Sequence, residues 1–283
     1  MLWGMSKNYM TTRRKLAIAT WARPREGNIY GKMTVDATNA LAWLEHTRET
    51  SGEKVTITHF VGRVVGEAMS QAPSLNGYIR FGRYVPHKQT NLSYLVALEE
   101  GANLAHAKID DINNKSVVDI ARELRELAAR VRAGKDKDFN KSQDPLKLLP
   151  TWLIKPIVFL TGWLTASLGI GVKALGLTPF PFGSCIVTSV GMFGLDEGYA
   201  PPTPFARTPV LVLIGAMRDT PVVRDGEIVV RKMLTITATI DHRFMDGYQG
   251  GVLAKVVRRC FEAPWSLDGH QAPPPALAEK LGL

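Results

Sequence analysis

The sequence predicts an α/β protein, because segments with the alternation of a strand and segments with helical spacing follow one another along the chain. Residues 28–38 put Met33 and Val35 on one face, as a half-buried strand does. Two helices are expected next, over residues 39–50 and 58–71, where apolar residues recur at helical spacing. With 283 residues and 45% hydrophobic content, the chain can bury a large core.

The rest of the chain continues this alternation and then becomes rich in strands. Residues 91–100 are strand-like, and residues 116–134 form a long amphipathic pattern that ends at Gly134, as helices often do. A polar stretch (135–145) and an apolar one (149–177) follow. Three strands are expected next, at 184–194, 209–217 and 232–241, and a hairpin turn at Asp225-Gly226 joins the last two. A last helix is expected at 247–262.

Charge and cysteine content limit the classes of function. The net charge of +9 favours anionic partners such as a phosphorylated cofactor, nucleic acid or an acidic membrane. The basic residues are spread out without the interleaved aromatics of a single-strand binder, so we expect no nucleic acid. Two cysteines are too few for a disulfide framework, and the first residues do not read as a signal peptide, so a cytoplasmic location is expected.

The stretch TIDHRFMDGYQGG (239–251) is the strongest candidate for a reactive site. His242 follows an expected strand, and Asp246 lies in the turn that begins the last helix, where the glycines would let the backbone turn tightly. No second histidine or cysteine stands at ligand spacing, so we expect no metal and assign His242 as a general base toward a hydroxyl or thiol. The alternative is a loop histidine that only bonds its neighbours.

Several segments in order resemble one family. DHRFMDG is similar to the His-x-x-x-Asp-Gly signature of the catalytic domain of the 2-oxo acid dehydrogenase acyltransferases, which also resembles chloramphenicol acetyltransferase. Five ordered matches are far more specific than one motif. The other segments that resemble this family are RRKLAIATW (13–21), VTITHFVGRVVGEAMSQAPSLNG (55–77), NLSYLVALEEGANL (91–104), IARELRELAARVRAGK (120–135) and CIVTSVGMFG (185–194).

The resemblance implies a single catalytic domain over residues 1–283, built as a two-layer α/β sandwich with a mixed sheet covered by helices. It also implies acyl transfer between coenzyme A, or acyl-coenzyme A, and a thiol. His242 would deprotonate the thiol, and Thr188 would stabilise the oxyanion. Asp246 would hold the His242 loop through hydrogen bonds or an arginine pair. Thr188 has the alternative reading of a strand threonine.

Family resemblance further implies a homotrimer whose active sites lie between subunits. We expect a stand-alone form without lipoyl or peripheral-subunit-binding domains. The lipoyl group would then come in trans, on a lipoyl-domain protein or with 2-oxo acid dehydrogenase subunits, unless the acceptor is another molecule. Residues 102–110 depart from the family pattern by carrying His106 and Lys108 and lacking a proline, which leaves the lining of an acyl or lipoyl tunnel open. The polar, proline-rich end makes cage assembly doubtful.

An apolar helical insertion is expected over residues 137–181. Residues 156–172 are uncharged but interrupted by glycines, so we expect a helical hairpin and not a membrane span. Residues 146–177 could make a peripheral membrane contact, receive a greasy substrate or partner, or be buried in the fold. Three functions therefore remain open: an active acyltransferase, an idle trimeric scaffold, and a membrane-surface or partner-binding module that uses the insertion.

Overall fold

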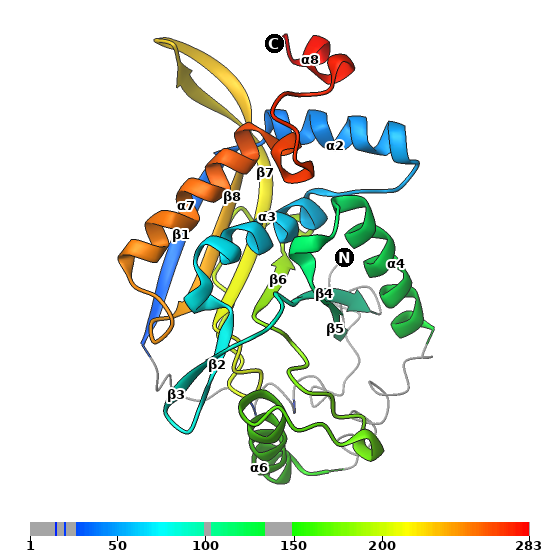
Figure 1. The fold of residues 1–283 in the computed structure, drawn as a ribbon, viewed down its shortest axis with the longest axis vertical. Coiled ribbons are helices and arrows are strands. Elements are labelled where there is room, and N and C mark those ends of the chain that lie inside the picture. The colour runs from blue at the N-terminus through cyan, green and yellow to red at the C-terminus, as the bar shows by residue number, and fades with distance from the viewer. Residues whose placement is uncertain (1–14, 16–19, 21–26, 99–102, 134–148, 283) are drawn as a thin grey trace, which may run out of the picture.

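The computed structural model describes residues 15, 20, 27–98, 103–133 and 149–282, and one central sheet organises them (Figure 1). The strands lie in the order β1-β8-β7-β6-β4-β5. Strand β6 runs parallel to both β4 and β7, and the other neighbours are antiparallel, so the sheet is mixed as predicted. The bounds are β1 Asn28–Asp36, β4 Leu92–Leu98, β5 Asn103–Ile109, β6 Cys185–Ser189, β7 Val210–Arg224 and β8 Glu227–Asp241.

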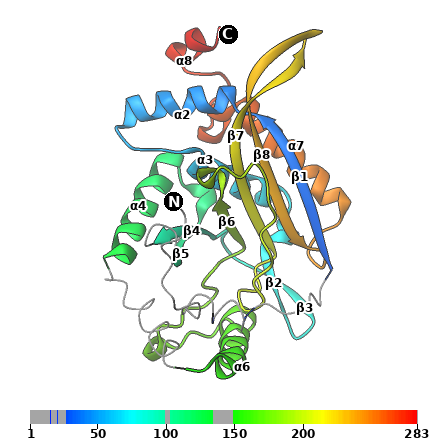
Figure 2. The ribbon, with the colours of Figure 1, turned by 180° about the vertical axis from the view of Figure 1, so that it is seen from behind.

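Helices cover one face of this sheet, in front of the strands in Figure 1 and behind them in Figure 2. The main core lies between the two layers. There Phe60 and Phe261 pack edge to face with ring centroids 5.1 Å apart, and the fully buried Tyr94 of β4 lies against Gly62. The predicted two-layer α/β architecture is therefore confirmed. The helices are α2 Thr38–Ser51, α3 Ile57–Gln71, α4 Val117–Arg132, α7 Gly247–Glu262 and α8 Pro275–Leu281.

The opposite face of the sheet is covered at its centre by an irregular segment. Ile186 and Leu211 form a small apolar cluster there with Ala206. The Thr237 hydroxyl donates a hydrogen bond to the Gly198 carbonyl. Residues 195–206 thus take the place that a second layer of helices has in a three-layer fold.

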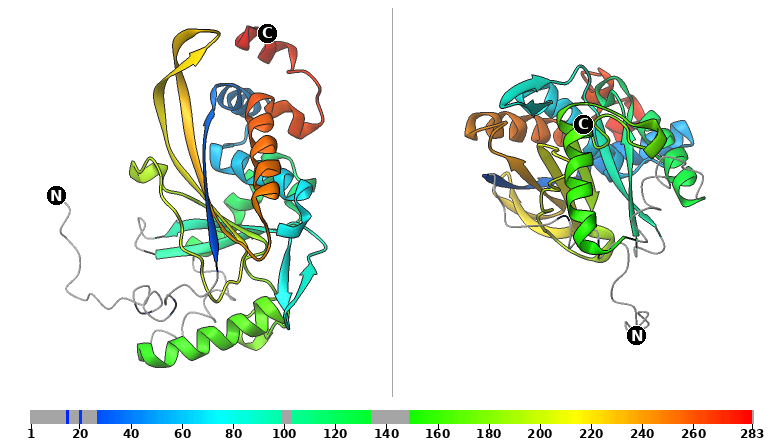
Figure 3. Two further views of the ribbon diagram at one scale, coloured as in Figure 1. Left: turned by 90° about the vertical axis from the view of Figure 1, so that its left-hand side faces the viewer. Right: turned by 90° about the horizontal axis from the view of Figure 1, so that it is seen from below.

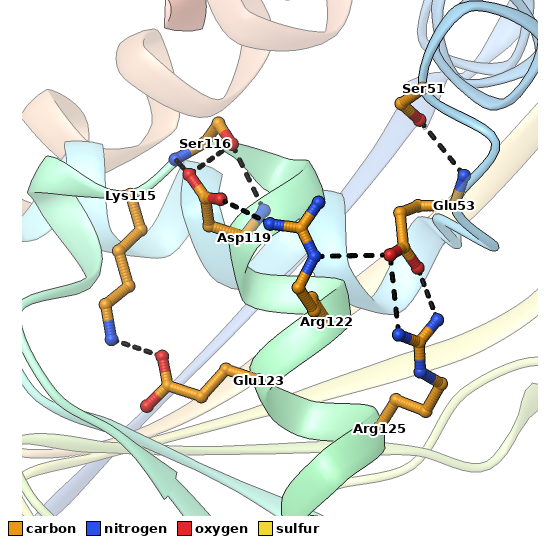
Figure 4. Close-up of polar contacts among 8 residues, drawn as sticks. All are labelled: Ser51, Glu53, Lys115, Ser116, Asp119, Arg122, Glu123 and Arg125. Atoms are coloured by element: carbon orange, nitrogen blue, oxygen red, sulfur yellow. Dashed lines mark hydrogen bonds and ion pairs between the residues drawn. The ribbon is translucent and has the colours of Figure 1, made fainter.

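Helix α4 is fixed at its first turns by charged contacts (Figure 4). The Ser116 hydroxyl accepts a bond from the Asp119 amide at 3.1 Å and donates to the Asp119 carboxylate at 2.7 Å, which caps the helix. Glu53, just after α2, accepts bonds from Arg125 and from Arg122, whose Nε lies 3.2 Å away. Arg125 first and then Arg122 hold the pKa of Glu53 below its usual range. These contacts tie the α2–α3 connection to α4.

One hairpin extends from the central sheet, and a second forms a two-stranded sheet of its own. The β7–β8 hairpin turns between Arg224 and Glu227, as predicted, and its tip extends beyond the helices (Figure 1). The second hairpin, β2 (Gly77–Arg80) and β3 (Arg83–Pro86), was not expected from the sequence. Strand β5 is also an addition, because it occupies most of the 102–110 stretch that we had considered only as tunnel lining.

The apolar segment contains one helix and not the expected hairpin. Helix α6 spans Thr151–Gly162 and continues into a π turn, Trp163–Ser167; a short 3₁₀ turn follows at Lys173–Leu175. Glycine takes positive φ at Gly169 and Gly176, which breaks further helix. Within the described ranges no helix is long and apolar enough to cross a bilayer. The first part of the proposed insertion, residues 137–148, lies outside the described residues.

Candidate functional site

His242 stands where β8 ends and a tight loop begins. Its backbone amide donates to the Gly27 carbonyl at 3.0 Å, which joins the loop to the residue before β1. The next turn is closed by a bond from the Phe244 amide to the Asp241 carbonyl, also at 3.0 Å. Phe244 and Met245 are buried in the main core, whereas His242 is exposed. The loop is thus anchored by its apolar residues and presents the imidazole to solvent.

The tautomer of His242 follows from one hydrogen bond. Its Nδ1 lies 2.6 Å from the Met245 carbonyl oxygen. A carbonyl can only accept, so Nδ1 carries the hydrogen in the neutral ring and Nε2 carries the free lone pair. The imidazole therefore offers a basic nitrogen at its exposed end. The role of the Met245 carbonyl could not be predicted from the sequence, because a backbone acceptor can come from any residue type.

Asp246 caps α7. Its Oδ1 accepts from the Tyr248 amide at 2.8 Å, while its own amide donates to the Gln249 side chain at 2.9 Å. The loop's arginine, Arg243, pairs with Asp241. Of the two expected ways for Asp246 to hold the loop, the structure shows hydrogen bonding. The Asp-x-x-Gln spacing was a readable signal for this capping box.

The glycines of the motif do not make the tight turn that we expected. Gly247, Gly250 and Gly251 are all helical residues of α7, and none has positive φ. A Cβ added at Gly247 or Gly251 would meet nothing within 4 Å, while one at Gly250 would meet the Met245 side chain at 3.3 Å. Gly247 and Gly251 therefore leave open space at the start of α7.

Thr188 lies far from His242 in the same chain. It is half-buried on β6, opposite Leu213 of β7, which in turn pairs with Thr237 of β8. His242 is five residues beyond Thr237 in the direction of β8. With a rise of about 3.3 Å per residue and about 4.8 Å between strands, their Cα atoms are roughly 19 Å apart. The structure does not bring these two candidate residues together within one subunit.

Exposed apolar side chains follow Thr188 directly. Met192, Phe193 and Leu195 are all exposed, although their segment is held against β7 by bonds from the Val190 amide to the Ile214 carbonyl and from the Ala216 amide to the Leu195 carbonyl. Apolar patches of this kind on a soluble protein mark contact surfaces. This surface lies at the end of β6 that carries Thr188.

Three further sequence predictions concern His106, a metal site and residues 13–21. His106 packs its ring on Phe182, with centroids 4.4 Å apart. In the part of the chain that the structure describes, no group of three or more histidine, cysteine or acidic residues could hold a metal ion. Residues 13–21, one of the segments of family resemblance, lie outside the described residues except for Lys15 and Thr20.

A family model, the 2-oxoacid dehydrogenases acyltransferase (catalytic domain), matches residues 15–142 and 174–268. The chain is 28% identical over 221 residues to the dihydrolipoyllysine-residue acetyltransferase component of the acetoin cleaving system of Bacillus subtilis; the match covers 77% of this chain and 44% of that protein. It is 40% identical over 85 residues to a lipoamide acyltransferase component of the branched-chain alpha-keto acid dehydrogenase complex of Pseudomonas putida, over 29% of this chain and 19% of that one. The chain thus spans less than half the length of these relatives.

Solved structures show the same fold. A probable dihydrolipoamide acetyltransferase from Listeria monocytogenes superposes with a TM-score of 0.65 at 20% identity, over 92% of each chain. The dihydrolipoamide acetyltransferase of Azotobacter vinelandii, studied for the catalytic roles of a serine, a histidine and an asparagine, gives 0.64 at 16% identity, over 90% of this chain and 88% of that one. The family model matches the chain on both sides of α6. The chain therefore belongs to the 2-oxoacid dehydrogenase acyltransferase family and corresponds to the catalytic domain of its members.

Proposed function

We propose that this chain catalyses acyl transfer between a coenzyme A thioester and a thiol, with His242 as the general base. The observation that carries the proposal is the bond from Nδ1 to the Met245 carbonyl, which leaves the Nε2 lone pair exposed. A thiol is mostly protonated near neutral pH, so a base within hydrogen-bond reach raises its reactivity in the transition state.

The reaction begins when His242 Nε2 takes the proton of the acceptor thiol. The sulfur then attacks the thioester carbonyl carbon, and the carbonyl oxygen becomes an oxyanion in the tetrahedral intermediate. Collapse of this intermediate re-forms the carbonyl and breaks the original carbon–sulfur bond. His242 returns its proton to the leaving sulfur, so the protein ends the cycle as it began.

Thr188 is the proposed donor to the oxyanion. At roughly 19 Å from His242 in one chain, the hydroxyl can act only if a second copy supplies it. The exposed Met192, Phe193 and Leu195 support a subunit contact at this end of β6. We therefore infer a homotrimer in which each site combines His242 of one subunit with Thr188 of the next.

Asp246 is proposed as a positioning residue and not as a proton carrier. The hydrogen bonds of its carboxylate and of its amide both cap α7, and the same turn carries the Met245 carbonyl that orients His242. In the Azotobacter vinelandii protein, the histidine and asparagine named for catalysis are four residues apart, as His242 and Asp246 are. An amide at that place supports a hydrogen-bonding role.

The names of the relatives indicate which acceptor and which acyl groups to test. These include acetyltransferases and succinyltransferases of dihydrolipoyllysine residues and a lipoamide acyltransferase of the branched-chain alpha-keto acid dehydrogenase complex. We propose coenzyme A as one substrate and a dihydrolipoyl group as the other, supplied in trans by a lipoyl-domain protein or by 2-oxo acid dehydrogenase subunits. The relatives' names give no single acyl group, so both acetyl and succinyl donors are tested.

The test is a thiol-release assay with the purified chain, acetyl- or succinyl-coenzyme A and dihydrolipoamide. His242→Ala should abolish turnover and leave the oligomer intact, because the side chain is exposed. Co-expression of His242→Ala with Thr188→Ala should then restore activity, since random mixing gives about one quarter of the sites both intact residues. A His242→Ala variant with wild-type turnover would refute the base, and failed complementation would refute the shared site.

A further inference from the structure

The outer face of α6 is mostly apolar, whereas the solvent-facing side of a helix is usually polar. Ile154 and Gly162 are buried on the inner side, and a Cβ at Gly162 would come within 2.6 Å of the Phe205 carbonyl oxygen. Trp152 and Phe159 lie on the outer side with 72% and 64% of their surface exposed. Exposed residues of a helix on a globular protein are usually polar. The outer face of α6 therefore has the composition of a contact surface.

The β2–β3 hairpin presents another exposed aromatic residue at the same end of the molecule. Phe81 and Gly82 form its two-residue turn, both with positive φ, and Phe81 is 79% exposed. Such a turn favours asparagine or glycine, so a bulky ring there is unexpected from local backbone preferences. Arg80 and Arg83 flank it and are exposed. The hairpin thus ends in an aromatic side chain between two cations.

Contacts join these two elements into one surface. Tyr78 of β2 packs on Phe180 with ring centroids 4.6 Å apart. The Phe180 amide donates to the Thr165 carbonyl, in the turn that follows α6, at 3.1 Å. The left view of Figure 3 shows α6 lying across the lower end of the molecule with the hairpin pointing down beside it. We call this surface, formed by residues 77–91 and α6, the basic aromatic end.

Charge at the basic aromatic end has one sign. Residues 77–91 and α6 contain no aspartate or glutamate, and their cations are Arg80, Arg83, Lys88 and Lys155. A second copy packed isologously on this surface would bring the same cations face to face, which opposes association. An anionic bilayer neutralises them and accepts the aromatic rings at its interface.

We propose that the basic aromatic end binds the surface of anionic membranes. The rings of Phe81, Trp152 and Phe159 enter the headgroup region, where aromatic side chains are favoured, and α6 lies in the plane of the interface. The cations on the hairpin and on α6 contact lipid phosphates. This attachment is independent of the acyl transfer proposed above, since none of these residues belongs to the catalytic site.

Vesicle co-sedimentation of the full chain tests the apolar part. Phosphatidylcholine vesicles with phosphatidylglycerol should bind the protein, and pure phosphatidylcholine vesicles should bind it far less. The triple variant Phe81→Ser/Trp152→Ser/Phe159→Ser should lose at least about tenfold in binding. The matched control, Val223→Ser/Ile228→Ser/Val230→Ser, removes equally exposed apolar residues from the β7–β8 tip and should bind as wild type.

The charge part has its own variants. Arg80→Gln/Arg83→Gln should weaken binding about 25-fold, at about fivefold for each cation near the surface. Arg130→Gln/Arg132→Gln changes the net charge equally on exposed positions of α4 and should have little effect. The proposal is overturned if wild-type protein ignores acidic vesicles. It is also overturned if the triple variant binds them normally, and a changed oligomeric state in light scattering would then assign the surface to a second copy. Acyl transfer in solution should be unchanged in the triple variant.

Discussion

Replacing Asp246 separates its capping role from a chemical one. Asparagine is as good an N-cap as aspartate, whereas alanine provides no acceptor for the Tyr248 amide. Loss of an N-cap costs about 1 kcal/mol, within a range of roughly 0.5–2 kcal/mol. For a chain of this size 1 kcal/mol corresponds to about 2 °C in Tm. Asp246→Ala should therefore lower Tm by a few degrees, and Asp246→Asn should leave it near the wild-type value.

Activity should follow the same order. In Asp246→Ala the first turn of α7 loosens, so the Met245 carbonyl no longer holds His242 Nδ1 in place and kcat falls more than KM rises. Asp246→Asn keeps the capping bond and should retain most of the wild-type kcat. Thermal unfolding and the thiol-release assay are measured on the same preparations.

One result would refute this reasoning about Asp246. If Asp246→Asn kept its Tm but lost as much kcat as Asp246→Ala, the negative charge itself would be required. The carboxylate would then act on the reacting groups or on the charged imidazole, and a capping role would not explain it. A shift in the kcat–pH profile of Asp246→Asn would identify which of these groups depends on the charge.

Three other predictions follow from the same structure. Thr188→Ala should lower kcat about 10²–10³-fold with little change in KM, and Thr188→Ser should keep most of the rate; equal losses in a steady-state assay would indicate a packing role for the methyl group. Burial lowers the pKa of His59 to about 4, so its neutral form stabilises the fold above about pH 6.5, and this contribution is lost as the pH falls from there toward 4. Urea unfolding at pH 7.5 and 4.5 gives the free energy of unfolding at each pH. His59 should account for a decrease of up to about 2.5 kcal/mol between them, which His59→Gln removes. If His59→Gln changed the free energy of unfolding with pH as much as the wild type does, this assignment would be contradicted. Gly62→Ala should unfold the core or displace Tyr94, because the added Cβ would lie 1.7 Å from the Tyr94 hydroxyl oxygen. A Tm from circular dichroism within one degree of the wild-type value would exclude this close contact.

Local signals predicted much of the fold. The bounds of α7 follow from the Asp246-x-x-Gln249 box and the helical spacing behind it, and the turn at Asp225-Gly226 fixed the long hairpin. Strand β5 was missed because Asn103–Ile109 is rich in alanine and its pairing with β4 is a tertiary contact. The β2–β3 hairpin was missed because its strands are only four residues long, with a phenylalanine in the turn.

The site was predicted only in part. His242 could be placed after a strand from the pattern alone, but its tautomer depends on a backbone carbonyl that composition does not show. The separation of Thr188 from His242 depends on the register of three strands, and register is set by packing across the sheet. The catalytic roles of His242, Thr188 and Asp246 stay predictions until they are measured.

The Met245 carbonyl has a consequence for the whole turnover cycle. It accepts the Nδ1 hydrogen when His242 is neutral, and the same bond persists when Nε2 also carries a proton, because Nδ1 is a donor in both states. The loop therefore has no reason to rearrange as the proton arrives and leaves. Preorganisation of this kind avoids reorganisation of the protein at the moment of reaction. Acyl transfer in either direction would therefore start from the same orientation of the His242 imidazole.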